Sequence, residues 1–396
     1  MKILIINTGY APNVYGGAEQ SVQNLAEGLA FTGHEVHAVS LTEARPWTWS
    51  EIGGVTIHYL PLRNIRFPFG KRNLPPYLAA PWHLIDTWNP LAARDLASLC
   101  RQLQPDVVHT NRLTGFSCSA WQAASRRSAP IVHTLRDYYL LHPNNTMFTD
   151  EQRYHHIGPV ARAYAMPRKW LSAVVDQVVG NSRFTLEQHT RAGYFPNAEK
   201  HVIANIFEPK AAKGKRPRGP LRFGYIGRLD PPKGLDLLIR EFPADLDNEL
   251  RIAGTGEPGY VAQLKSQAEG KPIAFLGHQK PDAFYTEIDI LVVPSVWHEP
   301  LPRVIFEANS YGIPVLGSNR GGIPEMIEQG RNGWIFDPAG PNALNRKITE
   351  IAAQPDTITP MAKPCLSYAR KFSPDVITTQ YLEVYRQAIS QTRPES

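Results

Sequence analysis

The sequence predicts an α/β protein with two doubly wound domains, each built on a parallel sheet with helices on both faces. Short apolar runs rich in β-branched residues alternate with stretches of helical periodicity almost throughout the chain, which is typical of such sheets. The 396 residues are enough for two or three domains of roughly 150 residues. A basic segment rich in proline and glycine, residues 210–220, interrupts the pattern, and a second series of strands follows it.

The first series of strands is expected at residues 2–7, 35–41, 55–60, 107–110, 131–135 and 177–180. Helices fall between several of them. The segment 17–32 carries apolar residues at spacings of 4, 3 and 4, as one face of a helix requires. The stretch from Leu91 to Leu103 has a similar pattern.

The second series of strands is expected at residues 221–226, 250–253, 273–276, 290–293 and 314–317. A final amphipathic helix is predicted over residues 374–392, with no strand after it. We therefore expect domains at 1–208 and 221–373, a linker at 209–220, and a carboxy-terminal helix within 374–396 that crosses back to the first domain.

Composition and charge exclude several classes of protein. Hydrophobic residues make up 42% and charged residues 20% of the chain, so it can bury large cores and is not disordered as a whole. The formal net charge is +6, and the cations between Lys210 and Arg222 account for it. That cluster contains no aromatic residue, which argues against a nucleic-acid partner. It is either a solvated linker or a segment attracted to an anionic lipid surface.

Cysteine usage and the start of the chain indicate a cytoplasmic location. The three cysteines, Cys100, Cys118 and Cys365, lack the paired spacing of a zinc site or a disulfide framework. The apolar run after Lys2 is too short for a signal peptide, and no stretch approaches the 18 apolar residues that span a bilayer. Any membrane contact is expected at the surface, at the inner face of the cytoplasmic membrane.

The loops that follow the strands are the expected ligand sites, because strand ends and helix N-termini present free N–H groups there. After the first strand, Gly16 and Gly17 open a helix, either as a plain tight turn or to let the backbone approach a ligand closely. This is not the G-x-G-x-x-G dinucleotide fingerprint, which is also missing after Ile226. A nicotinamide dehydrogenase is therefore disfavoured.

Two cations follow the first strand of the second half. Arg228 and Lys233 lie five residues apart in a Pro/Gly-rich loop, just before a helix expected to begin near Gly234. Arginine can form paired hydrogen bonds with phosphate oxygens, lysine adds a point charge, and the helix adds its positive dipole end. The loop is either a diphosphate clamp or a pair of ordinary surface charges.

Two carboxylates follow a later strand of the same half. Glu299 lies in the loop after residues 290–293, and Glu307 lies eight positions further on, in a helix. Glu299 is suited to accept hydrogen bonds from sugar hydroxyls, and Glu307 to accept both hydroxyls of a ribose, although capping or solvent exposure would also explain either residue alone. The segment 321–325, Gly-Gly-Ile-Pro-Glu, is a further glycine-rich loop.

Taken together, these motifs resemble the retaining GT-B glycosyltransferases of family 4, the group 1 glycosyltransferases that include bacterial polysaccharide mannosyl- and glucosyltransferases. The resemblance covers nearly the whole chain. It implies two Rossmann-like domains facing a cleft, and a nucleotide-diphosphate hexose such as GDP-mannose or a UDP-hexose as donor. The hexose would pass to a glycan or polyprenyl-diphosphate-linked acceptor in surface polysaccharide, exopolysaccharide or lipopolysaccharide assembly.

The resemblance also implies residue roles. Arg228 and Lys233 would hold the diphosphate, Glu307 the ribose and Glu299 the hexose. The backbone of Leu301, Pro302 and Arg303 would lie near the hexose, and the loop of Gly16 and Gly17 would close over phosphate and acceptor. Such enzymes retain configuration without a carboxylate nucleophile, and cations meet the charge on the leaving group. No metal or other cofactor is expected, and the adjacent His155 and His156 lack metal-ligand spacing.

The chain departs from the family pattern in its first half. Arg136, followed by Asp137, stands where the family commonly has a histidine, and Asn111 replaces the second histidine of a His-x-His motif that begins at His109. Arginine cannot act as a base, so Arg136 would contact donor phosphate, an acidic acceptor or an acidic sugar. His109 and His133 are either packed structural residues or contacts for acceptor or sugar.

Two further expectations concern the acceptor side and the alternatives. The segment 63–72 mixes cations with aromatics and, with Lys169 and Trp170, forms either an ordinary loop region or a peripheral contact with an anionic membrane. A sugar-nucleotide epimerase or hydrolase on the same fold remains open. So does a noncatalytic nucleotide-sugar-binding protein, because of Arg136.

Overall fold

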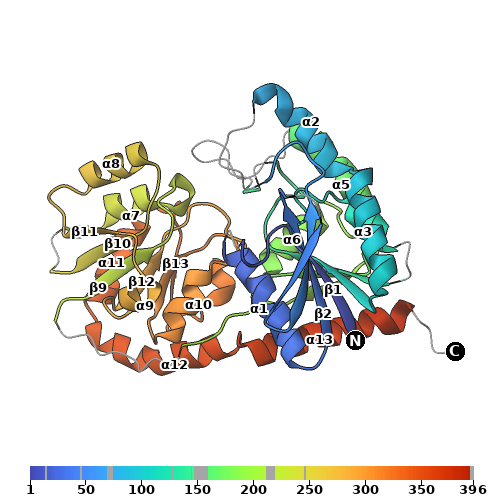
Figure 1. Cartoon of the computed structure of the whole chain (residues 1–396). Coiled ribbons are helices and arrows are strands. Elements are labelled where there is room, and N and C mark those ends of the chain that lie inside the picture. Colours follow the sequence, from blue (N-terminus) through green and yellow to red (C-terminus); the bar gives the residue numbers. More distant parts are fainter. Residues whose placement is uncertain are drawn as a thin grey trace. The chain divides into compact units, whose positions relative to one another are not determined.

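The computed structural model describes residues 1–13, 16–44, 47–68, 75–125, 129–143, 145–146, 159–210, 219–244 and 247–392 (Figure 1). Residues 69–72, His155, His156 and the linker residues 211–218 lie outside these ranges. The chain divides into two compact units, Met1–Ile206 with Pro374–Ser396, and Phe207–Ser373. We call them the amino-terminal unit and the carboxy-terminal unit.

The amino-terminal unit contains one sheet in the order β3-β4-β2-β1-β5-β6-β7-β8. Its strands are β1 (Lys2–Ile6), β2 (Glu35–Thr42), β3 (Thr48–Ile52), β4 (Val55–Pro61), β5 (Val107–Thr110), β6 (Ile131–Leu135), β7 (Gln177–Gly180) and β8 (Glu199–Val202). All neighbouring strands are parallel except β3, which runs antiparallel to β4. The strands predicted in this half are present. The edge strands β3 and β8 were not predicted, because their residues are largely exposed and form no apolar run.

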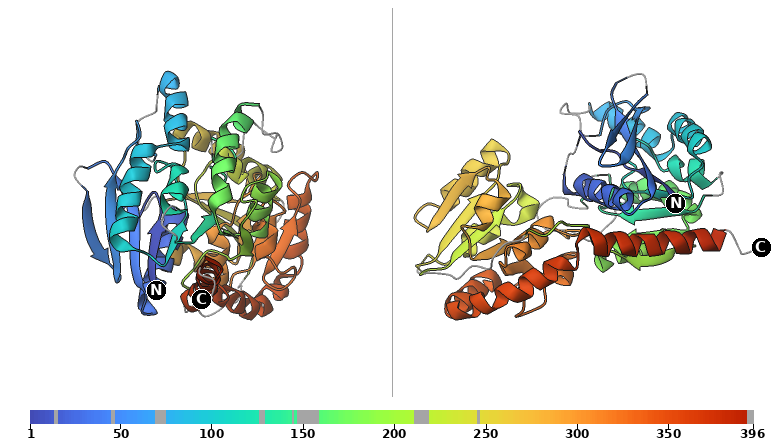
Figure 2. Two further views of the ribbon diagram at one scale, coloured as in Figure 1. Left: turned by 90° about the vertical axis from the view of Figure 1, so that its right-hand side faces the viewer. Right: turned by 60° about the horizontal axis from the view of Figure 1, so that its bottom comes forward.

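The helices of this unit are α1 (Gly17–Phe31), α2 (Pro76–Thr87), α3 (Pro90–Leu103), α4 (Ser119–Ser125), α5 (Pro159–Leu171), α6 (Arg183–Arg191) and α13 (Pro374–Thr392). Helix α13, red in Figures 1 and 2, packs along α1 of this unit. The approach is close at Gly28, where a Cβ atom would lie 2.6 Å from Oγ1 of Thr378. Glycine at this position therefore lets α13 lie against α1.

The carboxy-terminal unit contains a parallel sheet in the order β11-β10-β9-β12-β13-β14. Its strands are β9 (Arg222–Ile226), β10 (Glu249–Ala253), β11 (Ile273–Gly277), β12 (Ile290–Val293), β13 (Val315–Ser318) and β14 (Gly333–Phe336). Its helices are α7 (Leu235–Glu241), α8 (Pro258–Gln267), α9 (Pro281–Tyr285), α10 (Arg303–Ser310), α11 (Ala343–Ala352) and α12 (Ile358–Arg370). The strands predicted here are present; the edge strand β14 was missed.

Strand order reverses once within each unit. In the amino-terminal unit β1 lies between β2 and β5, and in the carboxy-terminal unit β9 lies between β10 and β12. At such a switch point the loops leaving two adjacent strands turn in opposite directions, which opens a crevice at the carboxyl edge of the sheet. The loops after β1 and β5, and those after β9 and β12, are therefore the places where each sheet can receive a ligand.

Candidate functional site

The switch point of the carboxy-terminal unit brings together two of the sequence motifs. Lys233, from the loop after β9, and Glu299, from the loop after β12, lie with Nζ and Oε1 2.8 Å apart. Both side chains are largely buried, at 20% and 7% exposure, so water screens this pair less than a surface pair. Ser295 Oγ also donates to Glu299 Oε1. The carboxylate is thus fixed from two sides.

Two glycines of the motifs hold these loops against each other. Gly234 has a φ of +74°, and a Cβ atom there would lie 2.1 Å from the carbonyl oxygen of Pro294. Gly321 has a φ of +59°, and its Cβ would lie 2.1 Å from the carbonyl oxygen of Glu299. The N–H of Gly322 donates to that same carbonyl at 2.8 Å. Backbone contacts that exclude a side chain therefore set the position of Glu299.

Glu307 lies in α10, and both of its carboxylate oxygens accept hydrogen bonds. Arg303 Nε donates to Oε1 at 3.0 Å, and the Tyr285 hydroxyl donates to Oε2 at 3.0 Å. Burial and the charge of Glu307 raise the pKa of Tyr285 well above its usual range, so this hydroxyl stays a donor. Each carboxylate oxygen has a second lone-pair site, so Glu307 can still accept hydrogen bonds from a diol.

Arg228 and the start of α10 supply the positive side of this site. The Arg228 side chain is 76% exposed and lies 3.1 Å from Asp230, a surface ion pair of little energetic weight. Pro302 is the N-cap residue of α10 and provides no side-chain hydrogen bond, with Leu301 before it and Arg303 after it. The first N–H groups of α10 are therefore without a side-chain cap, and helix N-termini of this kind attract anions.

The switch point of the amino-terminal unit holds a second charged cluster. Arg136, just after β6, donates from Nε to Asn111 Oδ1 at 3.0 Å and from a terminal nitrogen to Asn205. Asp137 lies 3.5 Å from Nε of Arg112, which follows β5. The guanidinium of Arg136 is thus held by two amide oxygens from separate segments, in a fixed orientation.

Glu19, in the first turn of α1, completes this cluster. It is 3% exposed, its Oε1 has no hydrogen-bond partner among the described residues, and a Cβ atom on Gly16 would lie 3.4 Å from Oε2. Burial raises the pKa of Glu19, although Arg112 and Arg136 act in the opposite direction. Gly16 is the extended N-cap residue of α1 and Gly17 the first helical residue, which places both beside this carboxyl.

Comparison with known proteins now identifies the family. Residues 207–372 match the family described as glycosyl transferases group 1, and residues 16–205 match the glycosyl transferase 4-like domain. A Klebsiella pneumoniae protein, described as an uncharacterized 42.6 kDa protein in the cps region, is 34% identical and covers 98% of this chain and 100% of its own length. This chain belongs to the group 1 glycosyltransferases.

Solved structures agree on the fold. Sucrose-phosphate synthase from Thermosynechococcus elongatus has a TM-score of 0.74 at 20% identity, over 98% of this glycosyltransferase and 99% of that chain. Anabaena HepE in complex with UDP has a TM-score of 0.69 at 19% identity, over 98% and 100% of the two chains. The glycosyltransferase therefore has the GT-B fold, as the sequence motifs imply.

The two histidines considered as acceptor or sugar contacts are core residues of the glycosyltransferase. His109 is fully buried, with Nε2 2.7 Å from Thr134 Oγ1 and Nδ1 2.7 Å from the Tyr385 hydroxyl, and burial lowers its pKa to about 3. His133 is also fully buried, stacks on Phe195, and has a pKa well below its usual range. Both side chains are thus packed in the core of the amino-terminal unit.

Asn111 lies next to Arg136. It is fully buried, and its Oδ1 atom accepts from Arg136. In this structure Asn111 therefore orients the guanidinium. This pairing gives a physical reason for the chain's two departures from the family pattern to occur together, because an asparagine oxygen can accept from a guanidinium.

Sequence reasoning missed three members of the amino-terminal cluster. Arg112 follows β5 by two positions, so its place at a strand end was a usable signal, and Glu19 occupies the helix turn that the glycine pair opens. Asn205 lies outside helices and strands, in a segment without a motif, and only the fold brings it to Arg136.

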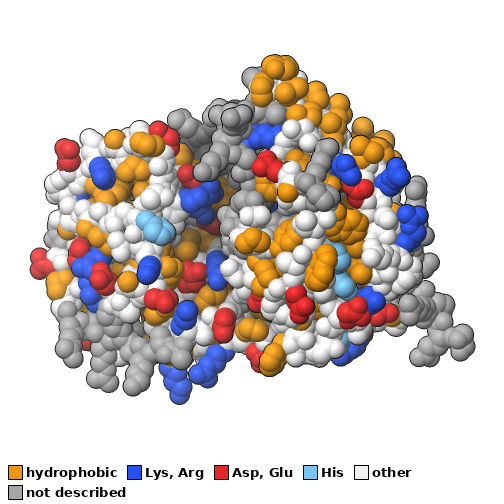
Figure 3. Space-filling model, viewed as in Figure 1, with side chains coloured by type: hydrophobic (Ala, Val, Ile, Leu, Met, Phe, Trp, Pro, Cys, Tyr) orange, Lys and Arg blue, Asp and Glu red, His pale blue; other side chains and the backbone are white. Residues whose placement is uncertain are grey.

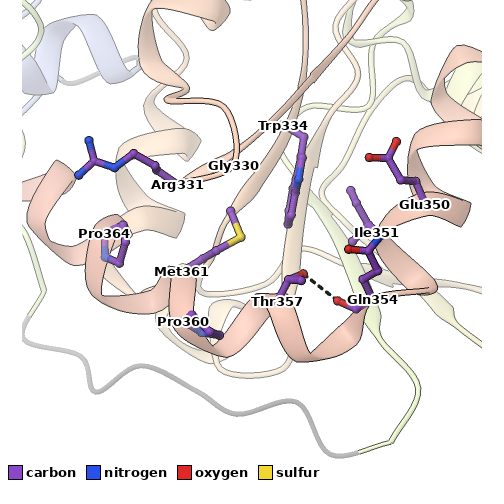
Figure 4. Close-up of a pocket in the computed structure, with 10 residues that line it drawn as sticks. All are labelled: Gly330, Arg331, Trp334, Glu350, Ile351, Gln354, Thr357, Pro360, Met361 and Pro364. Carbon is purple, nitrogen blue, oxygen red and sulfur yellow. Dashed lines mark hydrogen bonds between the residues drawn. The ribbon is translucent and has the colours of Figure 1, made fainter.

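One pocket of the glycosyltransferase lies away from these residues. It has a volume of about 480 Å³ and is lined by residues of β14, α11 and α12, with Trp334 and Met361 facing each other across it (Figure 4). The two charged residues at its rim have ion-pair partners, because Glu350 pairs with Lys347 and Arg331 with Glu328. Gly330 and Arg331 precede β14, so the pocket adjoins the amino end of that strand, whereas the motif loops leave carboxyl ends.

Within the described ranges, no group of three or more His, Cys, Asp or Glu side chains is placed to hold a metal ion. Helices long and apolar enough to cross a membrane are also missing from that part of the chain.

Proposed function

We propose that this glycosyltransferase transfers a hexose from a nucleotide-diphosphate sugar, with retention of configuration, to a glycan or polyprenyl-diphosphate-linked acceptor during bacterial surface polysaccharide assembly. The observation that carries the proposal is the contact between Lys233 and Glu299 at the switch point of the carboxy-terminal unit. It places a cation for phosphate and a carboxylate for sugar hydroxyls next to each other, where a doubly wound sheet receives its ligand.

The donor would extend along the residues of this edge. Arg228 is exposed and weakly paired, so it can turn to a diphosphate, and the uncapped start of α10 faces the same kind of charge. Glu307, fixed by Arg303 and Tyr285, would accept the ribose hydroxyls. Glu299, fixed by Ser295 and Lys233, would accept from the hexose. HepE has been solved with UDP-glucose, which supports a donor of this class.

Bond breaking in such a donor places negative charge on the departing diphosphate. Lys233 and Arg228 would stabilise that charge without a metal ion, and preorganised cations of this kind supply a large part of an enzyme's rate enhancement. A guanidinium offers hydrogen-bond donors and no acceptor, so Arg136 cannot remove the acceptor's proton. We assign it instead to binding an anionic group, either donor phosphate or an acid on the acceptor or sugar.

The polysaccharide assignment is supported by the cps-region description of the Klebsiella relative. The nucleoside and the hexose stay open between GDP-mannose and a UDP-hexose. We also propose that the enzyme works in the cytoplasm, at the inner face of the cytoplasmic membrane, because a polyprenyl-linked acceptor is held there.

A thermal-shift panel of GDP, UDP and ADP sugars tests the donor site. A ligand at about 100 times its Kd stabilises the folded state by roughly 2.7 kcal/mol, which shifts the melting temperature measurably. We expect one nucleotide sugar to stabilise the wild type but not Glu307→Ala. The matched control is Glu350→Ala, which removes an exposed glutamate of the same unit whose ion-pair partner is Lys347. Equal stabilisation of both variants would contradict the ribose assignment.

Product analysis separates the alternatives. Transfer to an added acceptor with retained anomeric configuration supports the proposal. Sugar released or epimerised without any acceptor would identify a sugar-nucleotide epimerase or hydrolase. Donor binding without turnover over a broad set of acceptors would indicate a noncatalytic nucleotide-sugar-binding protein.

A further inference from the structure

Large hydrophobic side chains are exposed on one unit only. Among the described residues, every large hydrophobic side chain that is exposed belongs to the amino-terminal unit, while those of the carboxy-terminal unit are at least partly covered. More than half of them come from α2, α5 and the segments next to these helices: Ile65, Tyr77, Leu84, Trp88, Leu91, Met166, Trp170 and Val174. A concentration of this kind marks a binding surface rather than chance exposure.

The exposed side of α2 is an apolar stripe. Tyr77, Pro81 and Leu84 are exposed at spacings of four and three, so they lie on one face of the helix. Trp88, at the helix end, and Leu91, in the first turn of α3, extend the apolar surface. The space-filling view shows hydrophobic side chains gathered over α2, with Lys and Arg side chains beside them (Figure 3).

The exposed side of α5 mixes apolar and basic residues. Arg162, Met166, Lys169 and Trp170 are exposed at helical spacing. The helix contains no acidic residue. Its outer face is therefore suited to a partner that is apolar in part and negatively charged in part.

The inner sides of these helices carry the charges. Asp86 of α2 and Arg168 of α5 are fully or almost fully buried, and their side chains lie 3.6 Å apart. Arg168 also donates to the backbone of Tyr164 and of His83, and its guanidinium lies 3.5 Å from the ring centre of Tyr164. On α2 the acidic side chain of Asp86 faces inward while Tyr77 and Leu84 are exposed, which reverses the usual amphipathic arrangement for that helix. The ion pair also fixes the two helices to each other.

We propose that this face, defined by Tyr77, Leu84, Trp88 and Leu91 of α2–α3 and by Arg162, Met166, Lys169 and Trp170 of α5, binds the surface of an anionic lipid bilayer. The apolar groups would enter the headgroup and acyl boundary, where tryptophan and tyrosine are favoured. The proposal deepens the proposed function, since it names the surface through which the enzyme would approach a lipid-linked acceptor.

Charge complementarity selects an anionic membrane as the occupant. Between residues 75 and 94 the only acidic side chain is Asp86, which is buried, and α5 has none. The exposed charges on α3 and α5 next to the apolar groups are Arg94, Arg162 and Lys169. Each cation near an anionic surface adds attraction that salt weakens. A second copy of this chain would bring like charges together, which disfavours a dimer through this face.

Vesicle co-sedimentation of the full chain tests the proposal. We expect binding to phosphatidylcholine vesicles that contain phosphatidylglycerol, weaker binding to phosphatidylcholine alone, and a decrease with added salt. The vesicle affinity of the double variant Leu84→Ser/Trp170→Ser should be at least about tenfold lower than that of the wild type. The variant Arg162→Gln/Lys169→Gln should lose most of the salt-sensitive part of vesicle binding. The matched control is Phe31→Ser/Trp49→Ser, which removes two exposed hydrophobic side chains elsewhere on the same unit.

Three outcomes would overturn the proposal. The first is the absence of vesicle binding by the wild type, and the second is an equal loss of binding in the control variant. The third is a wild-type dimer that Leu84→Ser/Trp170→Ser converts to monomer without any lipid binding, which would assign the face to self-association. Binding needs no catalysis, and the nucleotide-sugar thermal shift of the same variants should be unchanged. Failure of the membrane proposal is therefore distinct from failure of the proposed function.

Discussion

Lys233 Nζ lies 2.8 Å from Glu299 Oε1, so the cation and the carboxylate of the two motif loops are each other's counter-ions. A diphosphate that binds Lys233 must compete with this carboxylate, while the hexose hydroxyls would gain an acceptor. The pair therefore couples the two ends of the proposed donor site.

The first prediction tests this coupling with Glu299→Gln. Removing the charge frees Lys233, so nucleoside diphosphate should bind more tightly, while the rate of hexose transfer falls by about 10²-fold or more because the hexose loses its charged acceptor. Calorimetric titration with the nucleoside diphosphate and initial-rate assays measure the two effects. Weaker binding of the diphosphate by Glu299→Gln would show that the pair is structural only.

The second prediction concerns the arginine where the family commonly has histidine. Arg136→Lys removes the planar donor set that Asn111 and Asn205 hold, so kcat/KM should fall by about 10²-fold with little change in melting temperature. Arg191→Lys serves as control, because Arg191 is 73% exposed and forms its ion pair with Glu187 on its own helix. A histidine at position 136 that improves transfer would contradict the role assigned to the guanidinium.

The third prediction separates backbone clash from backbone strain. Gly234 and Gly270 have φ values of +74° and +75°, but a Cβ atom meets the Pro294 carbonyl at 2.1 Å in the first case and nothing within 4 Å in the second. Gly270→Ala should cost about 1 kcal/mol of unfolding free energy through its backbone conformation. Gly234→Ala should cost more and abolish the nucleotide-sugar thermal shift. Equal costs in chemical denaturation would exclude the loop contact as the cause.

The fourth prediction follows from the buried His109. Its pKa is lowered to about 3 in the folded state from about 6.5 in an unfolded chain. Between these two pKa values the unfolded state binds more protons than the folded state. The stabilisation that neutral His109 provides is therefore complete above pH 6.5. The free energy of unfolding falls as the pH decreases below that value, by up to about 1.4 kcal/mol per pH unit. Denaturation of wild type and His109→Gln from pH 7 to pH 4 measures it. The free energy of unfolding of the variant should fall less steeply with decreasing pH than that of the wild type. Identical pH dependences would contradict the effect assigned to His109.

The fifth prediction concerns metal. Since Arg228 and Lys233 would meet the charge on the leaving diphosphate, we expect the transfer rate to be unchanged by a chelator and by added Mg²⁺ or Mn²⁺. Initial rates after treatment with the chelator test this. A rate that disappears with the chelator and returns with one ion would assign part of the stabilisation to a metal.

The sequence predicted the centre of each sheet better than its edges. Strands such as β1 and β12 are buried apolar runs that carry their own signal, whereas the edge strands β3 and β8 consist of largely exposed residues, and β14 is a short run that begins with glycine. Their existence depends on a neighbouring strand that offers free backbone groups. Composition alone does not specify that neighbour.

The residues of the candidate site also differ in how far the sequence predicts them. The position of each loop after a parallel strand sufficed to expect Lys233 and Glu299 at the carboxyl edge of the second sheet, and the strand order brings them into contact. For His109 the position near a strand end was correct, but only the packing of α13 shows that Tyr385 covers its Nδ1 atom. Asn205 lies 69 positions from its partner Arg136, and no local pattern predicts such a pair.

Helix α13 belongs to the amino-terminal unit although it is synthesised after the whole carboxy-terminal unit. Its residues Tyr381 and Tyr385 are buried there against β5 and β6, beside His109. During translation the contiguous unit Phe207–Ser373 can therefore complete its core first. The residues translated first stay without their covering helix until Pro374–Thr392 has left the ribosome, so this half of the nascent chain is the one exposed longest to aggregation and to chaperones.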